Sequence, residues 1–457
     1  MSWIALKMLV GDKAKFFGIV MGLTFASLLI TQQGSIFCGL MCRTAGQIYD
    51  INGADLWIMD ANVRHVDDVK PMIENNLYRV RGVEGVHWAV PLYKGNARAK
   101  INSKTDPDVL KPAAAGAPEV RRKHQVIEQV ILVGLDDSSM VGAPPPSRMI
   151  AGKLSDLRKP DAVIVDFTRL TKLYPGENWK LLEKPGPVTR LKSHALGIVA
   201  WFQGKRFSEP KVMTNEEFYA RFLGRELEMN DHRAIVVGVC EATRTFQSNA
   251  VVYTTYSRAK RFAPQERKAL SYVLAKVEAP PRGGAETRKD YAARIERTRA
   301  EAASKIGRQT GLKALTSKQF IDLTIDYYLR YTGIPINFGI TAMLGFFVGT
   351  AIAGQTFYNF TIENLKQFGA LKAMGATNGR IVAMILLQAT VVGLLGYGLG
   401  LGLATWFGVA TQGGELAFYT PWQLLPITGV AVIFICILSS FLCVRRVMVL
   451  EPAVVFR

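Results

Sequence analysis

The sequence lacks the motifs of several large enzyme classes. It has no G-x-x-x-x-G-K-[ST] stretch with which to bind ATP through a P-loop of its own, and no G-x-S-x-G nucleophile elbow. Its 5 histidines are scattered along the chain without neighbouring cysteine pairs, which does not favour a metal site. We therefore predict that the chain is not an enzyme, and that it binds no cofactor and no metal of its own.

Asp, Glu, Lys, Arg and His are absent from four long stretches, residues 16–42, 331–362, 381–408 and 422–444. At 1.5 Å per residue, each is long enough as an α-helix to cross a hydrocarbon core of about 30 Å. We predict four transmembrane helices over these ranges. Proton- and ion-coupled carriers place ionisable groups inside the membrane, so their absence here indicates that a separate ATPase supplies the energy.

The charged residues are concentrated between the first and second apolar stretches. Residues 43–330 hold 47 of the 56 Lys and Arg and 33 of the 37 Asp and Glu, a net charge of +14. Such a surplus could indicate nucleic acid, but that reading needs a cytosolic domain, so we predict no nucleic-acid partner. Attraction to anionic headgroups of the lipid bilayer or to an acidic partner is favoured.

The two ends of this charged region share one pattern. Residues 55–59 and 87–93 have the composition of strands on either side of a helix at 66–80, and strands at 272–277 and 312–315 flank a charged helix at 285–308. Two split βαβ units of this kind predict one ferredoxin-like subdomain, made of porter-like parts at about 53–105 and 270–318. A helix at 317–330 then leads into the second apolar stretch.

The residues between these parts predict a mostly β insertion. Its expected strands lie at 127–133, 162–165, 195–200, 234–239 and 250–253. Residues 111–118 and 142–146 are rich in Pro, Ala and Gly, and we expect them to be surface excursions. The predicted fold class is a membrane protein of four transmembrane α-helices, with a large α+β extracytoplasmic domain between the first and second helices.

The distribution of basic residues predicts the orientation. Residues 1–15, expected to form an interfacial helix, the loop 363–380 and the tail 445–457 together hold nine Lys and Arg, whereas the loop 409–421 holds none and has Glu415. The positive-inside rule then places both termini and the 363–380 loop in the cytoplasm, and the charged domain outside.

The 363–380 loop contains an amphipathic segment. Leu365, Phe368, Leu371 and Met374 recur every three residues, which gathers them on one half of a short helix, and Gly375 supplies a left-handed stop. Because an exposed Phe368 is costly, we expect a partner to cover it. An ordinary interhelical loop resting on the headgroups is the alternative.

Small residues recur at a spacing of four in three of the apolar stretches. Such rows let helix backbones approach closely and favour packing within or between chains. The expected packing positions are Gly18, Gly22, Gly345, Gly349, Gly396 and Gly400.

Residues 368–376 (FGALKAMGA) resemble the signature of MacB-like ABC transporter permeases, the group that includes the FtsX, LolC/LolE and DevC proteins. Residues 332–339 (TGIPINFG) and 345–349 (GFFVG) are most similar to the DevC branch. The resemblance is specific over residues 331–457 and only topological over residues 43–330. It implies that the ATPase-coupling residues are Glu363, Leu365, Phe368, Gly369, Leu371, Lys372, Met374 and Gly375.

The resemblance also implies an inner-membrane homodimer with a separate ATP-binding subunit, which would hold ATP and Mg²⁺. A periplasmic adaptor and an outer-membrane channel are further implied partners, and the implied mechanism is mechanotransmission from the ATPase to the outer domain. One alternative keeps the family but assigns lipoprotein release or FtsX-like control of cell-wall hydrolases. The other is a membrane receptor with a ligand-binding outer domain.

Overall fold

The computed structural model describes residues 2–51, 53–103, 124–174, 215–264, 268–281, 286–411 and 416–448. The predicted strand at 195–200, the predicted loop at 111–118, and Glu415 lie outside these ranges. The chain divides into two compact units. We call Met1–Arg43 with Tyr328–Arg457 the helical unit and Thr44–Tyr327 the sheet unit.

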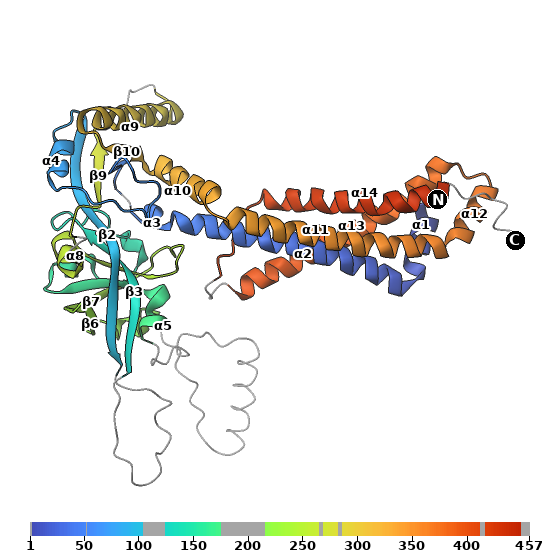
Figure 1. Cartoon of the computed structure of the whole chain (residues 1–457), viewed down its shortest axis with the longest axis horizontal. Helices are drawn as coiled ribbons and strands as arrows, with labels where there is room; N and C mark the ends of the chain where they lie inside the picture. The colour runs from blue at the N-terminus through green and yellow to red at the C-terminus, as the bar shows by residue number, and fades with distance from the viewer. Residues whose placement is uncertain are drawn as a thin grey trace, which may run out of the picture. The chain divides into compact units, whose positions relative to one another are not determined.

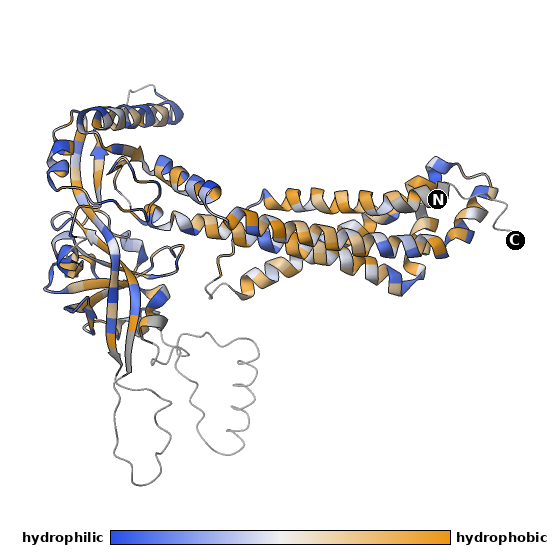
Figure 2. Cartoon of the chain, in the orientation of Figure 1, coloured by the Kyte–Doolittle hydropathy of each residue, from blue (hydrophilic) through white to orange (hydrophobic). Residues whose placement is uncertain are grey.

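The helical unit is built from long apolar helices (Figure 1). Its helices are α1 (Ser2–Gly11), α2 (Lys13–Thr44), α11 (Ile334–Glu363), α12 (Leu365–Ala373), α13 (Asn378–Ala410) and α14 (Leu424–Met448). Within the described residues, α2, α11, α13 and a segment of α14 are long and apolar enough to cross a membrane. In Figure 2 the ribbons of these helices are coloured mostly as hydrophobic residues. The prediction of four membrane helices is confirmed, and α10 (Ser317–Tyr331) precedes the second of them.

The two ends of the sheet unit share one antiparallel sheet. Its strand order is β10 (Lys313–Thr316), β1 (Leu56–Met59), β9 (Tyr272–Val277) and β2 (Val86–Ser103). The connecting helices are α4 (Asn75–Arg81) and α9 (Arg288–Thr310). This is the strand order of a ferredoxin-like subdomain made from two split βαβ units. The prediction of an α+β domain between the first two membrane helices is therefore confirmed.

The helix predicted at 66–80 is wrong over most of its length, because only α4 is helical there. Pro71 has no N–H to donate and restricts the backbone of the residue before it, which disfavours a helix through this point. Asp68 also accepts hydrogen bonds from the backbone N–H and the guanidinium of Arg64, which favour a non-helical turn.

The insertion continues the same sheet through β2. Residues 86–92 of this strand pair with β9, whereas residues 93–103 pair with β3 (His124–Leu135). The remaining elements are β4 (Met149–Gly152), β5 (Ala162–Asp166), β6 (Glu226–Met229), β7 (His232–Cys240), β8 (Ala250–Thr255), α3 (Gly46–Asp50), α5 (Leu170–Leu173), α7 (Asn215–Ala220) and α8 (Tyr256–Phe262), with short 3-10 turns at Pro146–Arg148, Leu154–Arg158 and Phe167–Arg169. Neither β4 nor β6 was predicted.

Both faces of the sheet are covered, so the sheet unit has a hydrophobic core on each side. Leu56 and Ile58 of β1 belong to one core, and the alternate residues Trp57 and Met59 belong to the other. The second core also includes residue 143, and Gly142, Ala143 and Pro144 are buried. The surface excursion predicted at 142–146 is therefore wrong over these three residues.

Candidate functional site

The first candidate site is α12, the short helix of the 363–380 loop. It begins directly after α11, and the backbone N–H of Phe368 donates to the carbonyl of Asn364 at 3.0 Å. At its end Gly375 has a φ of +93°, the left-handed conformation that the sequence predicted. The N–H of Ala376 donates to the carbonyl of Leu371 at 3.0 Å, which closes the helix and turns the chain toward α13.

The apolar face of α12 is covered by its own chain, so the expectation that a partner covers Phe368 is wrong. Phe368 is 1% exposed and lies with Leu9, Phe360 and Ile381 in the core of the helical unit. Leu371 and Gly369 are also buried, and Leu365 is half-buried. The partner that covers the aromatic ring is the rest of the helical unit.

The opposite face of α12 is exposed. Met374 is 75% exposed. At 100° per residue, a step of three residues turns backwards by about 60°, so three such steps place Met374 roughly half a turn from Leu365. The residues exposed with Met374 are Lys366, Gln367, Ala370 and Ala373. We call these five residues the open face of α12.

Glu363 and Lys372 differ in their surroundings. The carboxylate of Glu363 accepts from the ammonium of Lys15 at the start of α2, and Lys15 also donates to Asp12 at 2.5 Å. The hydrogen bond from Lys15 lowers the pKa of the Asp12 carboxyl. Lys372 is half-buried on α12. Because Glu363 is exposed, this ion pair should contribute little to stability.

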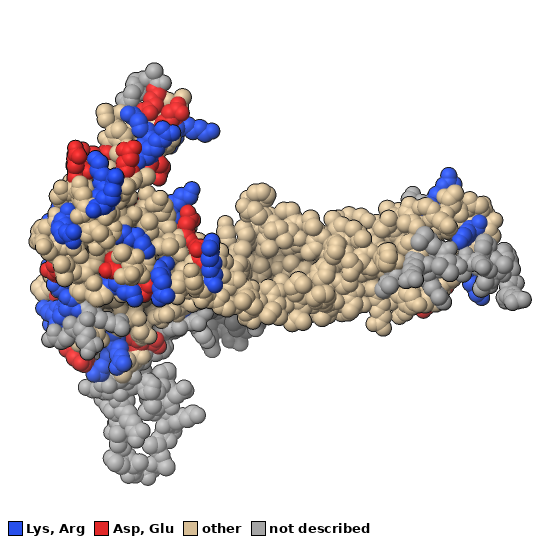
Figure 3. Space-filling model, turned by 45° about the horizontal axis from the view of Figure 1, so that its top comes forward, with Lys and Arg blue, Asp and Glu red and all other residues tan. Residues whose placement is uncertain are grey.

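The N-terminal helix α1 packs at the same end of the helical unit. Ala5 and Leu9 are buried with Phe368, and the side-chain amide of Gln388 in α13 donates to the carbonyl of Ala5 at 2.7 Å. Trp3 remains exposed. Figure 3 shows Lys and Arg side chains at one end of the helical unit and a long stretch of surface without charged residues beside it.

The predicted glycine rows lie at contacts between helices of one chain. A Cβ added to Gly22 would lie 2.7 Å from the Ile352 side chain, and one added to Gly345 would lie 2.9 Å from Leu29 Cβ. Gly349 likewise faces Ala26, and Gly18 faces Thr356. These four glycines let α2 and α11 approach closely.

Gly396 and Gly400 of α13 face α2 in the same way. An added Cβ would lie 2.6 Å from Leu23 Cβ at Gly396, and 2.7 Å from the carbonyl oxygen of Thr24 at Gly400. All six predicted packing glycines therefore contact α2 or lie on it.

A cavity of about 390 Å³ lies between α13 and α14. Its lining is apolar apart from Thr390 and Tyr397, whose hydroxyls donate to the backbone carbonyls of Leu386 and Leu425. The donors of both hydroxyls are thus used within the chain, and the mainly apolar lining disfavours a polar solute.

The sheet unit contains a polar cluster that sequence reasoning missed. Asp50 is 1% exposed, and its carboxylate accepts from Arg148, from the Thr243 hydroxyl, and from the Thr243 backbone N–H at 2.7 Å. Nearby Asp166 is also buried, and burial raises the pKa of its carboxyl to about 6. The signal in the sequence that could have indicated this cluster was the position of Asp50, six residues after the end of α2.

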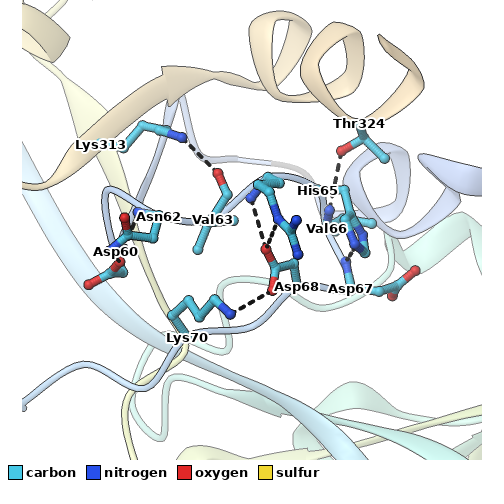
Figure 4. A network of polar contacts seen from close by, with 11 residues as sticks. Asp60, Asn62, Val63, His65, Val66, Asp67, Asp68, Lys70, Lys313 and Thr324 are labelled. Atoms are coloured by element: carbon cyan, nitrogen blue, oxygen red, sulfur yellow. Dashed lines mark hydrogen bonds and ion pairs between the residues drawn. The ribbon is translucent and has the colours of Figure 1, made fainter. Parts of the chain in front are cut away.

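Residues 60–70 form a network that ties this loop to β10 and α10 (Figure 4). The ammonium of Lys313 donates to the carbonyl of Val63 at 2.7 Å, and the backbone N–H of Val66 donates to the Thr324 hydroxyl at 3.3 Å. His65 stacks on Tyr327, and burial lowers the pKa of its imidazole. His65 is thus a packed residue, and no group of three or more His, Cys, Asp and Glu among the described residues is placed to hold a metal ion.

Comparisons with known proteins bear on the C-terminal part of the chain. Residues 338–452 match the family model described as "FtsX-like permease C-terminal". A search of curated proteins gave no match.

Two solved structures show weak likeness to the chain. The extracellular domain of the noncanonic ABC-type transporter YknZ from Gram-positive bacteria is 13% identical, with 57% of this chain and 99% of that chain covered and a TM-score of 0.29. The periplasmic region of MacB from Actinobacillus actinomycetemcomitans is 10% identical, with 62% and 96% covered and a TM-score of 0.31. Scores at this level do not establish a common fold.

Proposed function

This chain carries an FtsX-like permease C-terminal domain over residues 338–452, and from that premise we propose that it is the permease subunit of an ABC-type export system. ATP would be bound and hydrolysed by a separate subunit. The chain would act by mechanotransmission, so that movement of the membrane helices reshapes the sheet unit. A homodimer in the inner membrane, with both termini in the cytoplasm and the sheet unit outside, is the assembly we propose.

The packing of the helical unit supports a mechanical role. Close contacts at glycines join α11 and α13 to α2, so a displacement at one end of α2 is passed to its neighbours rather than absorbed. The cavity between α13 and α14 has an apolar lining apart from two hydroxyls, and both of these donate to backbone carbonyls of the chain. We therefore propose that substrate need not cross this subunit.

The exposure of α11 supports the homodimer. Of the four membrane helices it is the least covered, with 17% of its most apolar window buried. Large apolar side chains follow its exposed side at helical spacing, namely Ile336, Ile340, Met343, Leu344, Phe347 and Val348. We propose that part of this row packs against a second copy and the rest against lipid. A periplasmic adaptor and an outer-membrane channel would complete a DevC-like system.

The observation that carries the proposal is the open face of α12. It presents exposed Met374 together with exposed Lys366, Gln367, Ala370 and Ala373, while Phe368 and Leu371 anchor the helix in the core. An ATP-binding subunit gripping this face would move Phe368 with it, and through Phe368 the packed ends of α1 and α13.

The test replaces Met374 by Ala in the full chain. Loss of a central apolar contact at an interface commonly costs about 1–2 kcal/mol, so we expect affinity for the ATP-binding subunit to fall about 5- to 30-fold, with stimulated ATP turnover falling in parallel. Met21→Ala is the matched control, because it is the same change at an exposed methionine of α2, outside both α12 and the exposed row of α11. Equal affinity and equal ATP turnover for both variants and the parent would contradict the proposed contact.

A further inference from the structure

The sheet unit contains a polar cavity of about 480 Å³, a size typical of small-ligand sites. It lies where β2 leaves β9 and begins to pair with β3. The residues that line it and matter for its chemistry are Asp67, Tyr93, Lys94, Thr245, Gln247 and Ser271. The helical unit and α12 contribute nothing to it, so the inference goes beyond the proposed function and stands independently of it.

Lys94 is the charged group of the cavity. Its side chain is 8% exposed, and its ammonium donates to the carbonyl of Val66 at 2.6 Å and to the Asp67 carboxylate at 2.5 Å. An ammonium has three N–H donors, so one of them has no acceptor among the described residues. Burial lowers the pKa of Lys94, while Asp67 opposes this effect.

The backbone of Lys94 is held in place by a neighbouring strand. The Ser271 hydroxyl accepts from the N–H of Lys94 and donates to its carbonyl, both at 3.0 Å. This pair of bonds fixes the strand at the point where it changes partners, and so fixes the base of the lysine side chain.

Thr245 supplies a second unsatisfied group on the cavity wall. Its residue is 5% exposed, and its hydroxyl has no hydrogen-bond partner among the described residues. A buried hydroxyl without a partner is destabilising, and a bound ligand that accepts its hydrogen bond would recover this cost. The exposed amide of Gln247, two residues on, adds another polar group at the rim.

The charges around the cavity favour an anion. Asp67 is paired with Lys94, and Asp68 is paired with both Arg64 and Lys70, so three cations surround two carboxylates. The region 43–330 also has a surplus of basic residues. We propose that this cavity binds a carboxylate group, which accepts hydrogen bonds from the ammonium of Lys94 and the hydroxyl of Thr245. The carboxylate could be presented by a small organic acid or by the C-terminus of a short peptide.

A carboxylate bound in the cavity would contact the segment that donates hydrogen bonds to Asp50. Thr245 lies two residues after Thr243, whose N–H and hydroxyl donate to the Asp50 carboxylate. A ligand bridging Lys94 and Thr245 would therefore join β2 to the segment on which α3 is anchored.

The test measures binding by calorimetry to the full chain in detergent micelles, with no ATP-binding subunit present. The probes are trialanine and trialanine amide, which differ only in the carboxylate, together with succinate and succinamide. We expect at least one carboxylate to bind and its amide counterpart not to bind. Binding of succinate identifies an organic acid as sufficient, whereas binding of trialanine alone identifies a peptide C-terminus.

Variants separate this site from non-specific binding. Thr245→Val keeps the shape of the side chain and removes a hydroxyl without a partner, so it should weaken carboxylate binding about tenfold without lowering the unfolding temperature. Lys94→Gln should abolish binding. Lys70→Gln is the matched control, because Lys70 pairs with Asp68 but does not line the cavity, and it should leave affinity unchanged.

Three results would overturn the proposal. One is the absence of carboxylate-dependent binding when the probes are present at about 10 mM, a concentration high enough to detect binding with a Kd of about 1 mM. The second is equal binding of the acids and their amides, and the third is unchanged affinity of Thr245→Val. Because the ATP-binding subunit takes no part, none of these results bears on the coupling role of α12.

Discussion

Four glycines of α13 allow the packing of the helical unit to be tested within a single helix. Gly396 and Gly400 face α2, whereas a Cβ added to Gly398 or Gly402 would meet nothing within 4 Å. Replacing the first pair by Ala should therefore destabilise the unit. The same change in the second pair should stabilise it slightly, because the two pairs differ only in what they face.

The magnitude follows from the geometry. Alanine is favoured over glycine in a helix by about 0.5–1 kcal/mol, and this gain applies to both pairs. At Gly396 and Gly400 the added carbon would lie 2.6 Å from Leu23 Cβ and from Ser27 Cβ, respectively, where contacts of 3.4–4 Å are ordinary. Overpacking of this kind costs about 1–3 kcal/mol per site, and because both sites separate the same two helices, the second costs less than the first. We expect the two double variants to differ by about 2–4 kcal/mol.

Reversible unfolding of the full chain in mixed micelles, titrated with a denaturing detergent, measures this difference. The Gly398→Ala/Gly402→Ala variant should unfold at or above the detergent fraction of the parent, and the Gly396→Ala/Gly400→Ala variant well below it. Equal midpoints for the two double variants would refute the close contact between α13 and α2.

Two further predictions concern the buried carboxylates of the sheet unit. Arg148→Ala removes one donor from Asp50 and should lower the free energy of unfolding by about 2–3 kcal/mol, measured by denaturant titration with circular dichroism. Arg158→Ala removes an exposed bond to a carbonyl and should cost less than about 1 kcal/mol. Equal losses in the two variants would contradict the role of Asp50. For Asp166, burial raises the pKa of the carboxyl in the folded chain to about 6, from an ordinary value of 3.8. The unfolded chain therefore releases this proton at a lower pH than the folded chain does. The contribution of Asp166 to stability is fully present below about pH 4 and is lost as the pH rises to about 6. The loss should be roughly 3 kcal/mol, and Asp166→Asn, which keeps the acceptor for the Thr168 N–H, should abolish this dependence; an unchanged pH profile in that variant would show that another group titrates.

The membrane helices could be predicted because their signal is local. A run without ionisable residues is needed for any helix that crosses hydrocarbon, whatever its neighbours are. Their ends were less predictable, since α2 continues to Thr44 and α13 to Ala410. Backbone hydrogen bonds extend a helix past the point where its apolar run stops, so hydropathy sets the span but not the boundary.

The sheet unit was predicted in outline but not in its central strand. Residues 87–93 have a strong strand composition, but β2 continues to Ser103 through a stretch in which Ala97, Ala99 and Ile101 are the buried residues. Two of these three are alanines, which carry little strand propensity and little hydrophobic contrast with their neighbours. The pairing with β3 supplies the missing stabilisation, and that pairing depends on residues far away in the sequence. The cavity at this point of β2 was unpredictable for the same reason.

The same reasoning explains why α12 was predicted as a helix but with the wrong exposed face. A spacing of three residues is enough to indicate a short amphipathic helix, and it does place Phe368 and Leu371 together on a buried side. It does not say what covers that side, because Leu9 of α1 and Ile381 of α13 come from distant parts of the chain. Since Phe368 is buried, its replacement by Ala would disturb the fold of the helical unit as well as any coupling, by about 3–5 kcal/mol for a fully buried aromatic ring. A loss of transport in that variant could not be assigned to a partner. The exposed Met374 is free of this ambiguity, so contact with an ATP-binding subunit has to be judged on the open face of α12.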